Sequence, residues 1–277
     1  MKEIIVDTFL DSIKLLPFLF LAFLIIELIE HKLSEKTTKA IAKSNKFGPL
    51  VGSLLGGFPQ CGFSVVATNL YITRIISLGT LISIYLSTSD EMLPILISHN
   101  ADIKIIFSIL GIKIIVGMLC GFIIDLIYRR KESAHFDLCD DDHCDCEDSI
   151  LKSSFIHTLK TLSFIMVVLL VLNSIMYYLP EETISNMFLK NTTFAPILSS
   201  LIGLIPSCAS SVIITEFYLN DVITFGTCIA GLLTNSGLSI LVLFKTNKNN
   251  KENLLILTLV YLIGIIAGII INLLAFL

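Results

Sequence analysis

Long apolar runs alternate with short polar segments along almost the whole chain. Four runs are uninterrupted and long enough to cross a bilayer as single helices: 7–30, 103–128, 153–178 and 254–277. Four others are interrupted by proline or by polar residues: 47–72, 75–99, 194–219 and 222–243. Proline inside a helix removes a hydrogen bond and clashes with the preceding turn. The pattern therefore predicts an all-α polytopic membrane protein with both continuous and broken helices.

The order of these runs in the first half recurs in the second half. Adding 147 to the residue numbers superimposes Gly56, Pro59, Cys61 and Ser64 on Gly203, Pro206, Cys208 and Ser211, and matches continue as far as Ser89 and Ser236. Two polar, proline-broken patches at corresponding places of two apolar halves indicate the binding site of a transporter.

The positions of the cations predict how the halves lie in the membrane. If 47–72 and 194–219 turn back as re-entrant hairpins, 13 Lys and Arg residues flank the cytoplasmic side and 3 the outer side. Each repeat then crosses three times, so the second repeat is inverted and both termini are extracytoplasmic. The predicted units are a first repeat at 1–131, a cytoplasmic linker at 132–152 and a second repeat at 153–277.

Composition narrows the class further. Of the 277 residues, 55% are hydrophobic and only 15% are charged, whereas a soluble domain has about 25% charged residues. The seven cysteines are odd in number and clustered, which favours thiols in a reducing cytoplasm over a disulfide framework. No phosphate-binding glycine loop and no basic nucleic-acid patch is present. The expected partners are the lipid bilayer and a small inorganic or metalloid substrate, with a homodimer left open and nucleic acid excluded.

The two proline-broken tips are the expected substrate-binding elements. A helix that restarts after the proline presents unpaired amides and a positive dipole end, which attract oxygen-bearing or anionic groups. Cysteine sulfur at the same place suits thiophilic ions. The candidates are Pro59, Gln60, Cys61, Ser64, Thr68, Pro206, Ser207, Cys208, Ser210, Ser211 and Thr215. The alternative is that these small residues only allow close helix packing.

A second pair of interruptions is expected to complete the site. Residues 87–91 and Pro94 interrupt the run 75–99, and residues 234–237 interrupt the equivalent run. Hydroxyls, an amide and freed carbonyls there can bind Na⁺ or substrate: Ser87, Thr88, Ser89, Thr234, Asn235 and Ser236.

Ionisable residues within the apolar runs are candidates for coupling to Na⁺ or protons, because charges at membrane depth are rare and usually functional. They are Asp90, Glu91, Lys113 and Glu216. Lys113 is the expected partner of Asp90, and whether that pair serves transport or only holds the bundle stays open. Asp125 lies near a helix end and is expected to reach solvent.

The central linker carries thiols, imidazoles and carboxylates within a short polar stretch. Zinc or another soft divalent metal could be bound by Cys139, His143, Cys144 and Cys146. The spacing is not that of a zinc finger, so the alternative is a disordered acidic linker with incidental cysteines. No cofactor is expected to be required for transport.

The repeated G-x-x-P-x-C, the three-plus-three crossing pattern and the Cys/His/acid-rich linker resemble the ten-helix heavy-metal exporter family. Its members are also labelled arsenic efflux proteins or manganese transporters. The resemblance implies a secondary active transporter of the cytoplasmic membrane that exports a metal or metalloid species, and not an enzyme. One alternative is an ion-coupled carrier of a small anion. Another is a membrane enzyme that uses Cys61 and Cys208 as a thiol pair, although the chain has no Cys-x-x-Cys there.

Overall fold

The computed structural model describes residues 47–57, 62–89, 92–128 and 194–275, together with isolated positions within 16–24 and 155–170. The first half contributes five helices to this part: α3 (Gly48–Gly56), α4 (Gly62–Ile72), α5 (Leu78–Ser87), α6 (Met92–Ser98) and α7 (Ile103–Ile127). The second half contributes α10 (Ala195–Gly203), α11 (Cys208–Leu219), α12 (Phe225–Thr234), α13 (Ser239–Thr246) and α14 (Asn250–Ala275). The part of the chain that the structure describes contains no strand.

The two sets of helices are repeats of each other. Adding 147 to the bounds of α3 and α5 gives the bounds of α10 and α12, and the other three pairs agree within one residue at each end. The helix caps repeat as well: the hydroxyls of Ser77 and Thr224 accept from the backbone amides of Thr80 and Thr227 at the starts of α5 and α12. The internal repeat seen in the sequence is therefore a repeat of structure.

The predicted interruptions of the broken runs are confirmed, with two corrections. Pro94 does not interrupt a helix, because it lies in the first turn of α6, where a missing amide costs nothing. The last helix begins at Asn250, four residues before the predicted start, and α13 extends to Thr246. The predicted helices 7–30 and 153–178 and the linker lie outside the described residues.

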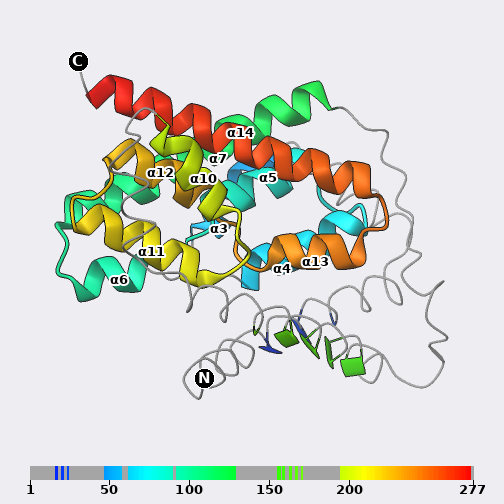
Figure 1. The fold of residues 1–277 in the computed structure, drawn as a ribbon. Coiled ribbons are helices and arrows are strands. Elements are labelled where there is room, and N and C mark those ends of the chain that lie inside the picture. Colours follow the sequence, from blue (N-terminus) through cyan, green and yellow to red (C-terminus); the bar gives the residue numbers. More distant parts are fainter. Residues whose placement is uncertain are drawn as a thin grey trace.

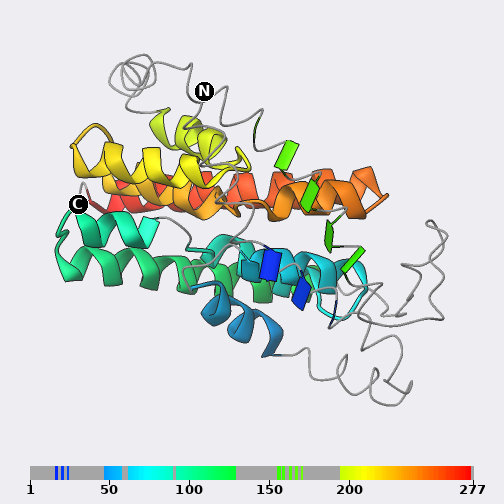
Figure 2. The ribbon, with the colours of Figure 1, turned by 90° about the horizontal axis from the view of Figure 1, so that it is seen from below.

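Helices of each half pack on helices of the other half, and the contacts come in equivalent pairs. α4 packs on α13, α11 packs on α6, and α5 packs on α12. In Figure 1, α14 runs toward the C-terminal label while α7 runs away from that side. Figure 2 shows the helices of each half in a separate layer, with α3 and α10 on opposite outer sides. The broken helices α5 and α12 lie between the outer helices, and their breaks meet in the interior of the bundle.

Glycines allow α5 and α7 to cross in close backbone contact. A Cβ at Gly79 would lie 2.1 Å from the carbonyl oxygen of Gly121, and one at Gly121 would lie 2.7 Å from that of Gly79. The second repeat has the same contact between Gly226 and Gly268, at 2.6 and 2.7 Å. Small residues at such crossings are typical of helices packed in a membrane.

Three of the described helical segments are long and apolar enough to cross a membrane: Ile103–Ile127, Phe225–Thr246 and Asn250–Leu274. In Ile103–Ile127 and Asn250–Leu274, only 22% of an 18-residue apolar stretch is buried inside the protein. In Phe225–Thr246, which contains the break after α12, 89% of such a stretch is buried. The exposed side chains of α7 and α14 are large and apolar, such as Phe107, Leu126, Ile266 and Leu273. The outer helices are thus suited to lipid, and the broken helices form the interior.

Candidate functional site

Polar side chains from both repeats are buried around the helix breaks. Each of the following is at most 2% exposed: Ser64, Thr68, Ser87, Thr88, Ser89, Ser207, Ser210, Ser211, Thr215, Thr234, Asn235 and Ser236. Pro206, between α10 and α11, is half-buried. These were all predicted as site residues, and burial of so many hydroxyls and amides requires internal hydrogen bonds.

A hydrogen bond joins the first tip to the second repeat. The Ser64 hydroxyl, at the start of α4, donates to the carbonyl oxygen of Ser236 at 3.3 Å. The hydroxyl of Tyr85 lies 2.6 Å from that of Thr68 and also bonds the carbonyl oxygen of Ser239 at 3.5 Å. The first two turns of α4, the last turn of α5 and the break before α13 therefore form one polar cluster.

Sequence reasoning missed Tyr85 and Ser239. Tyr85 lies inside the apolar run of α5, and the repeat has Leu232 at its place, so the repeated pattern gave no signal for it. The only clue was a phenol hydroxyl in a helix that is otherwise apolar around it, which needs a partner when it is buried.

Most of the predicted hydroxyls donate to a carbonyl of their own helix. Thr68 and Thr215, at equivalent places, donate to the carbonyl oxygens of Ser64 and Ser211 at 2.7 Å. Such a hydroxyl has satisfied its donor and still offers lone pairs to a ligand. The hydroxyls of Ser87, Thr88, Ser210 and Thr234 bond in the same local way.

The break after α12 differs, because two of its polar atoms have no hydrogen-bond partner within the described chain. They are the amide nitrogen Nδ2 of Asn235 and the hydroxyl of Ser236, both buried. The other side of the Asn235 amide, Oδ1, accepts from the backbone amide of Gly237 at 3.0 Å, which fixes its orientation. A buried donor without a partner is costly, so these two atoms are the best candidates for direct contact with a substrate.

A lysine lies at the same break. Lys113, halfway along α7, is 1% exposed, and its Nζ donates to the carbonyl oxygens of Thr88 and Leu232, the latter at 2.8 Å. Its predicted partner Asp90 lies outside the described residues, as does Glu91. Glu216 is half-buried and lies in the last turn of α11, which ends at Leu219.

Several other predictions fall outside what the structure describes. Pro59, Gln60 and Cys61 belong to residues 58–61, and only the backbone of Cys208 is described, as the first residue of α11. The predicted linker ligands Cys139, His143, Cys144 and Cys146 are likewise outside. Within the described ranges, no group of three or more His, Cys, Asp or Glu side chains is placed to hold a metal ion.

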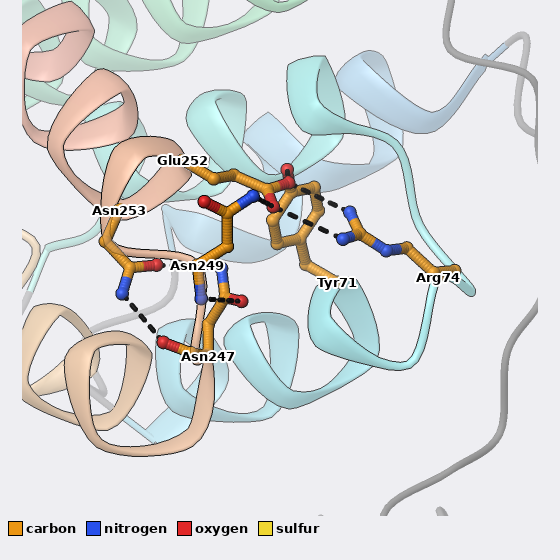
Figure 3. A network of polar contacts seen from close by, with 6 residues as sticks. All are labelled: Tyr71, Arg74, Asn247, Asn249, Glu252 and Asn253. Atoms are coloured by element: carbon orange, nitrogen blue, oxygen red, sulfur yellow. Dashed lines mark hydrogen bonds and ion pairs between the residues drawn. The ribbon is translucent and has the colours of Figure 1, made fainter.

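An ion pair closes one end of the bundle. Arg74, in the turn after α4, donates to the carboxylate of Glu252 at 2.9 and 3.2 Å through its two terminal nitrogens. The Tyr71 hydroxyl donates to the same carboxylate, and Asn249 Nδ2 approaches it at 3.4 Å (Figure 3). The bond to Glu252 raises the pKa of Arg74 above its ordinary value. This cluster, called the Arg74 clamp below, ties the end of α4 to the start of α14.

The clamp is not repeated at the other end of the bundle. Asp221 corresponds to Arg74 and has the same left-handed backbone, with φ of 58° against 63°. Ile105 corresponds to Glu252. An aspartate and an isoleucine cannot form this ion pair, so the two ends differ in chemistry although their backbones match.

Asp125 is half-buried near the end of α7, and its carboxylate is held by two hydrogen bonds to the start of α5. Its carboxylate accepts from the hydroxyl of Ser77 at 2.7 Å and from the backbone amide of Gly79 at 2.8 Å. Asn272 takes its place in the second repeat and accepts from Thr224 at 2.8 Å. Both side chains hold the start of a broken helix: Asp125 accepts from an amide at the start of α5, which has no partner within its helix, and Asn272 accepts from the hydroxyl that caps α12. Asp125 therefore has a structural role.

These observations define the class: an α-helical, multi-pass membrane protein with an internal repeat and a buried polar centre at its helix breaks. A family model described as "Putative, 10TM heavy-metal exporter" matches residues 1–168 and again residues 145–276. The chain belongs to this family. No curated protein and no solved structure matches it.

Proposed function

We propose that the chain is a secondary active transporter of the cytoplasmic membrane that exports a metal or metalloid species by alternating access around two paired hairpin tips. The observation that carries this proposal is the meeting of breaks from both repeats in one buried polar cluster. Polar atoms in an apolar bundle are costly, and those of Asn235 and Ser236 have no partner within the described chain. A passing substrate would supply the missing hydrogen bonds.

In this proposal the repeats are inverted, and α3–α4 and α10–α11 are re-entrant hairpins. The reciprocal packing of α4 on α13 and of α11 on α6 supports it, as does the short length of the arms. At 1.5 Å per residue, arms of 9 to 12 residues span roughly half of a 30 Å hydrocarbon core. Non-helical tips at that depth are tolerated where protein buries them.

The Arg74 clamp would act as the cytoplasmic gate. The cation distribution predicts that the turn after α4 lies on the cytoplasmic side, and the clamp joins that turn to α14. Because the other end lacks the ion pair, opening toward the outside would leave the clamp closed, and opening toward the cytoplasm would break it.

An ion-coupled carrier of a small anion is the second candidate. The starts of α4 and α11 have their positive dipole ends toward the tips, which favours negative charge. The ammonium of Lys113 lies between the C-terminal ends of α5 and α12. This candidate shares the fold and the site, and differs in what the tips bind.

Serine in place of both tip cysteines separates the two candidates. The variant Cys61→Ser with Cys208→Ser keeps the side-chain volume nearly constant and removes both soft ligands. For a thiophilic substrate, flux into sealed proteoliposomes should fall to background, while Cys120→Ser, outside the tips, should retain it. Undiminished flux of the double variant would reject thiolate binding and favour the anion carrier.

A further inference from the structure

The ammonium of Lys113 joins broken helices of both repeats. Thr88 is the C-terminal cap of α5, and Leu232 lies in the last turn of α12. Nζ donates to the carbonyl oxygens of both, and the side chain is 1% exposed. One cation thus sits where the carboxyl ends of two helices from different halves meet.

The helix ends at this place carry partial charge opposite in sign to that of Lys113. The C-terminal end of a helix carries a partial charge of about −0.5, concentrated on its last unpaired carbonyls. Two such ends place negative partial charge on carbonyls that the ammonium of Lys113 contacts. Without a cation, the two ends would face each other in the interior of the bundle and repel, because little solvent is there to screen them.

Only one of the two repeats supplies this charge. Adding 147 to Lys113 gives Val260 on α14, a fully buried apolar side chain. In transporters built from broken helices, freed carbonyls and C-terminal helix ends coordinate the coupling cation. Here the same kind of carbonyls bind a side chain instead.

We propose that the ends of α5 and α12 form a monovalent cation site that Lys113 occupies as a tethered cation. The wild-type protein therefore binds no free Na⁺ at this place, and removal of the side chain opens the site to a small free cation. The inference deepens the proposed function by assigning this site, but its test reads protein stability and not flux. A failure of the transport assays and a failure of this test are therefore distinguishable.

The test is thermal unfolding of purified Lys113→Ala in detergent. The protein is measured in choline chloride, NaCl and methylammonium chloride at equal ionic strength, because choline is too large for the site. We expect Lys113→Ala to unfold at a lower temperature than wild type in choline chloride. In NaCl or methylammonium chloride its unfolding temperature should rise by roughly 5 °C or more, as expected when a ligand is present well above its dissociation constant.

Three proteins serve as controls. Wild type should not distinguish the three salts, because its site is filled. Lys113→Met removes the charge but fills the space, so it should be destabilised and not rescued. Lys104→Ala removes an exposed lysine from the same helix and should behave as wild type. A Lys113→Ala protein that unfolds at the same temperature in all three salts, or a Lys113→Met protein as stable as wild type, would overturn the proposal.

If Lys113→Ala yields no folded protein, the internal repeat supplies another variant. Lys113→Val combined with Val260→Lys moves the ammonium to the equivalent helix, where we expect it to reach the carbonyls of Tyr85 and Asn235, the equivalents of Leu232 and Thr88. This protein should elute from size exclusion as a single folded species, while Lys113→Val alone should not. Equal loss of folded protein in both would reject the shared cation site.

Discussion

At the residue scale, the molecule separates hydroxyls that hold helices from polar atoms that are free to bind. Ser83 and Ser236 are both fully buried serines near the centre. The Ser83 hydroxyl donates to the carbonyl oxygen of Thr80 in its own helix at 2.7 Å, whereas that of Ser236 has no partner within the described chain. Burial alone therefore does not distinguish the two serines, whereas the presence or absence of a hydrogen-bond partner does.

Replacement of Ser236 by alanine should impair transport without loss of stability. The hydroxyl makes no bond that its removal would break, so the free energy of unfolding should stay constant or rise slightly. Loss of one substrate contact of about 1.4 kcal/mol should lower initial flux roughly tenfold. Flux in proteoliposomes and thermal unfolding are measured together, with Ser83→Ala as the matched control that retains flux. If both variants transport normally, Ser236 does not contact the substrate.

At the element scale, the sequence predicted the breaks well and the partners poorly. Pro59 and Pro206 located the breaks of two runs, because proline acts locally on its own helix. Polar residues at 87–91 and 234–237 located the breaks of the other two. The reasoning from proline wrongly predicted a break at Pro94, since the effect of a proline depends on whether it lies inside a helix or in its first turn. The crossing of Gly79 on Gly121 and the bond from Ser77 to Asp125 join distant segments, and no local pattern specifies such contacts.

The glycine crossing of α5 and α7 should not tolerate a methyl group. In Gly121→Ala the new Cβ would meet the Gly79 carbonyl oxygen at 2.7 Å and the Pro49 Cβ at 2.8 Å, which should cost about 1–3 kcal/mol of unfolding free energy. Gly111→Ala on the same helix has no atom within 4 Å of its new Cβ and should be neutral or stabilising. Equal effects of the two substitutions on unfolding in detergent would show that the crossing is not tightly packed.

The Arg74 clamp should couple the end of α4 to α14. The Glu252 side chain is 7% exposed and that of Arg74 is 30% exposed, so the pair is partly screened and should contribute about 1–2 kcal/mol. A double-mutant cycle of Arg74→Ala and Glu252→Gln measures this coupling through unfolding free energies. Asp221→Ala, at the equivalent turn, should be additive with Glu252→Gln. If the effects of Arg74→Ala and Glu252→Gln on the free energy of unfolding are additive, the ion pair does not stabilise the contact between α4 and α14.

At the scale of the whole molecule, the internal repeat organises both fold and site. Equivalent helices such as α7 and α14 differ by one residue in length and share crossing glycines. Yet Val260 stands at the position equivalent to Lys113, and Asp221 at that equivalent to Arg74. The sequence predicted the repeat because identities recur at one spacing. It could not predict which single-copy residues act at the centre, because residues such as Tyr85 and Ser239 owe their importance to contacts between the halves.

Opposite orientation of the halves predicts different accessibility for two equivalent turns. Single cysteines introduced at residues 73–74 should be protected from an impermeant thiol reagent in intact cells, and those at 220–221 should react, because the first turn faces the cytoplasm and the second faces outward. Labelling before and after permeabilisation measures this. Equal labelling at both turns in intact cells would contradict the inverted repeat.

Export itself is tested most directly by solute movement across a sealed membrane. Purified wild-type protein in proteoliposomes is given thiophilic metals, metalloids and small anions in turn, with and without Na⁺ and pH gradients. The account predicts protein-dependent, gradient-dependent flux of a metal or metalloid species that stops when the gradient is collapsed. Absence of flux for every solute, together with catalytic consumption of a thiol reagent by the same protein, would contradict it and assign a membrane enzyme instead.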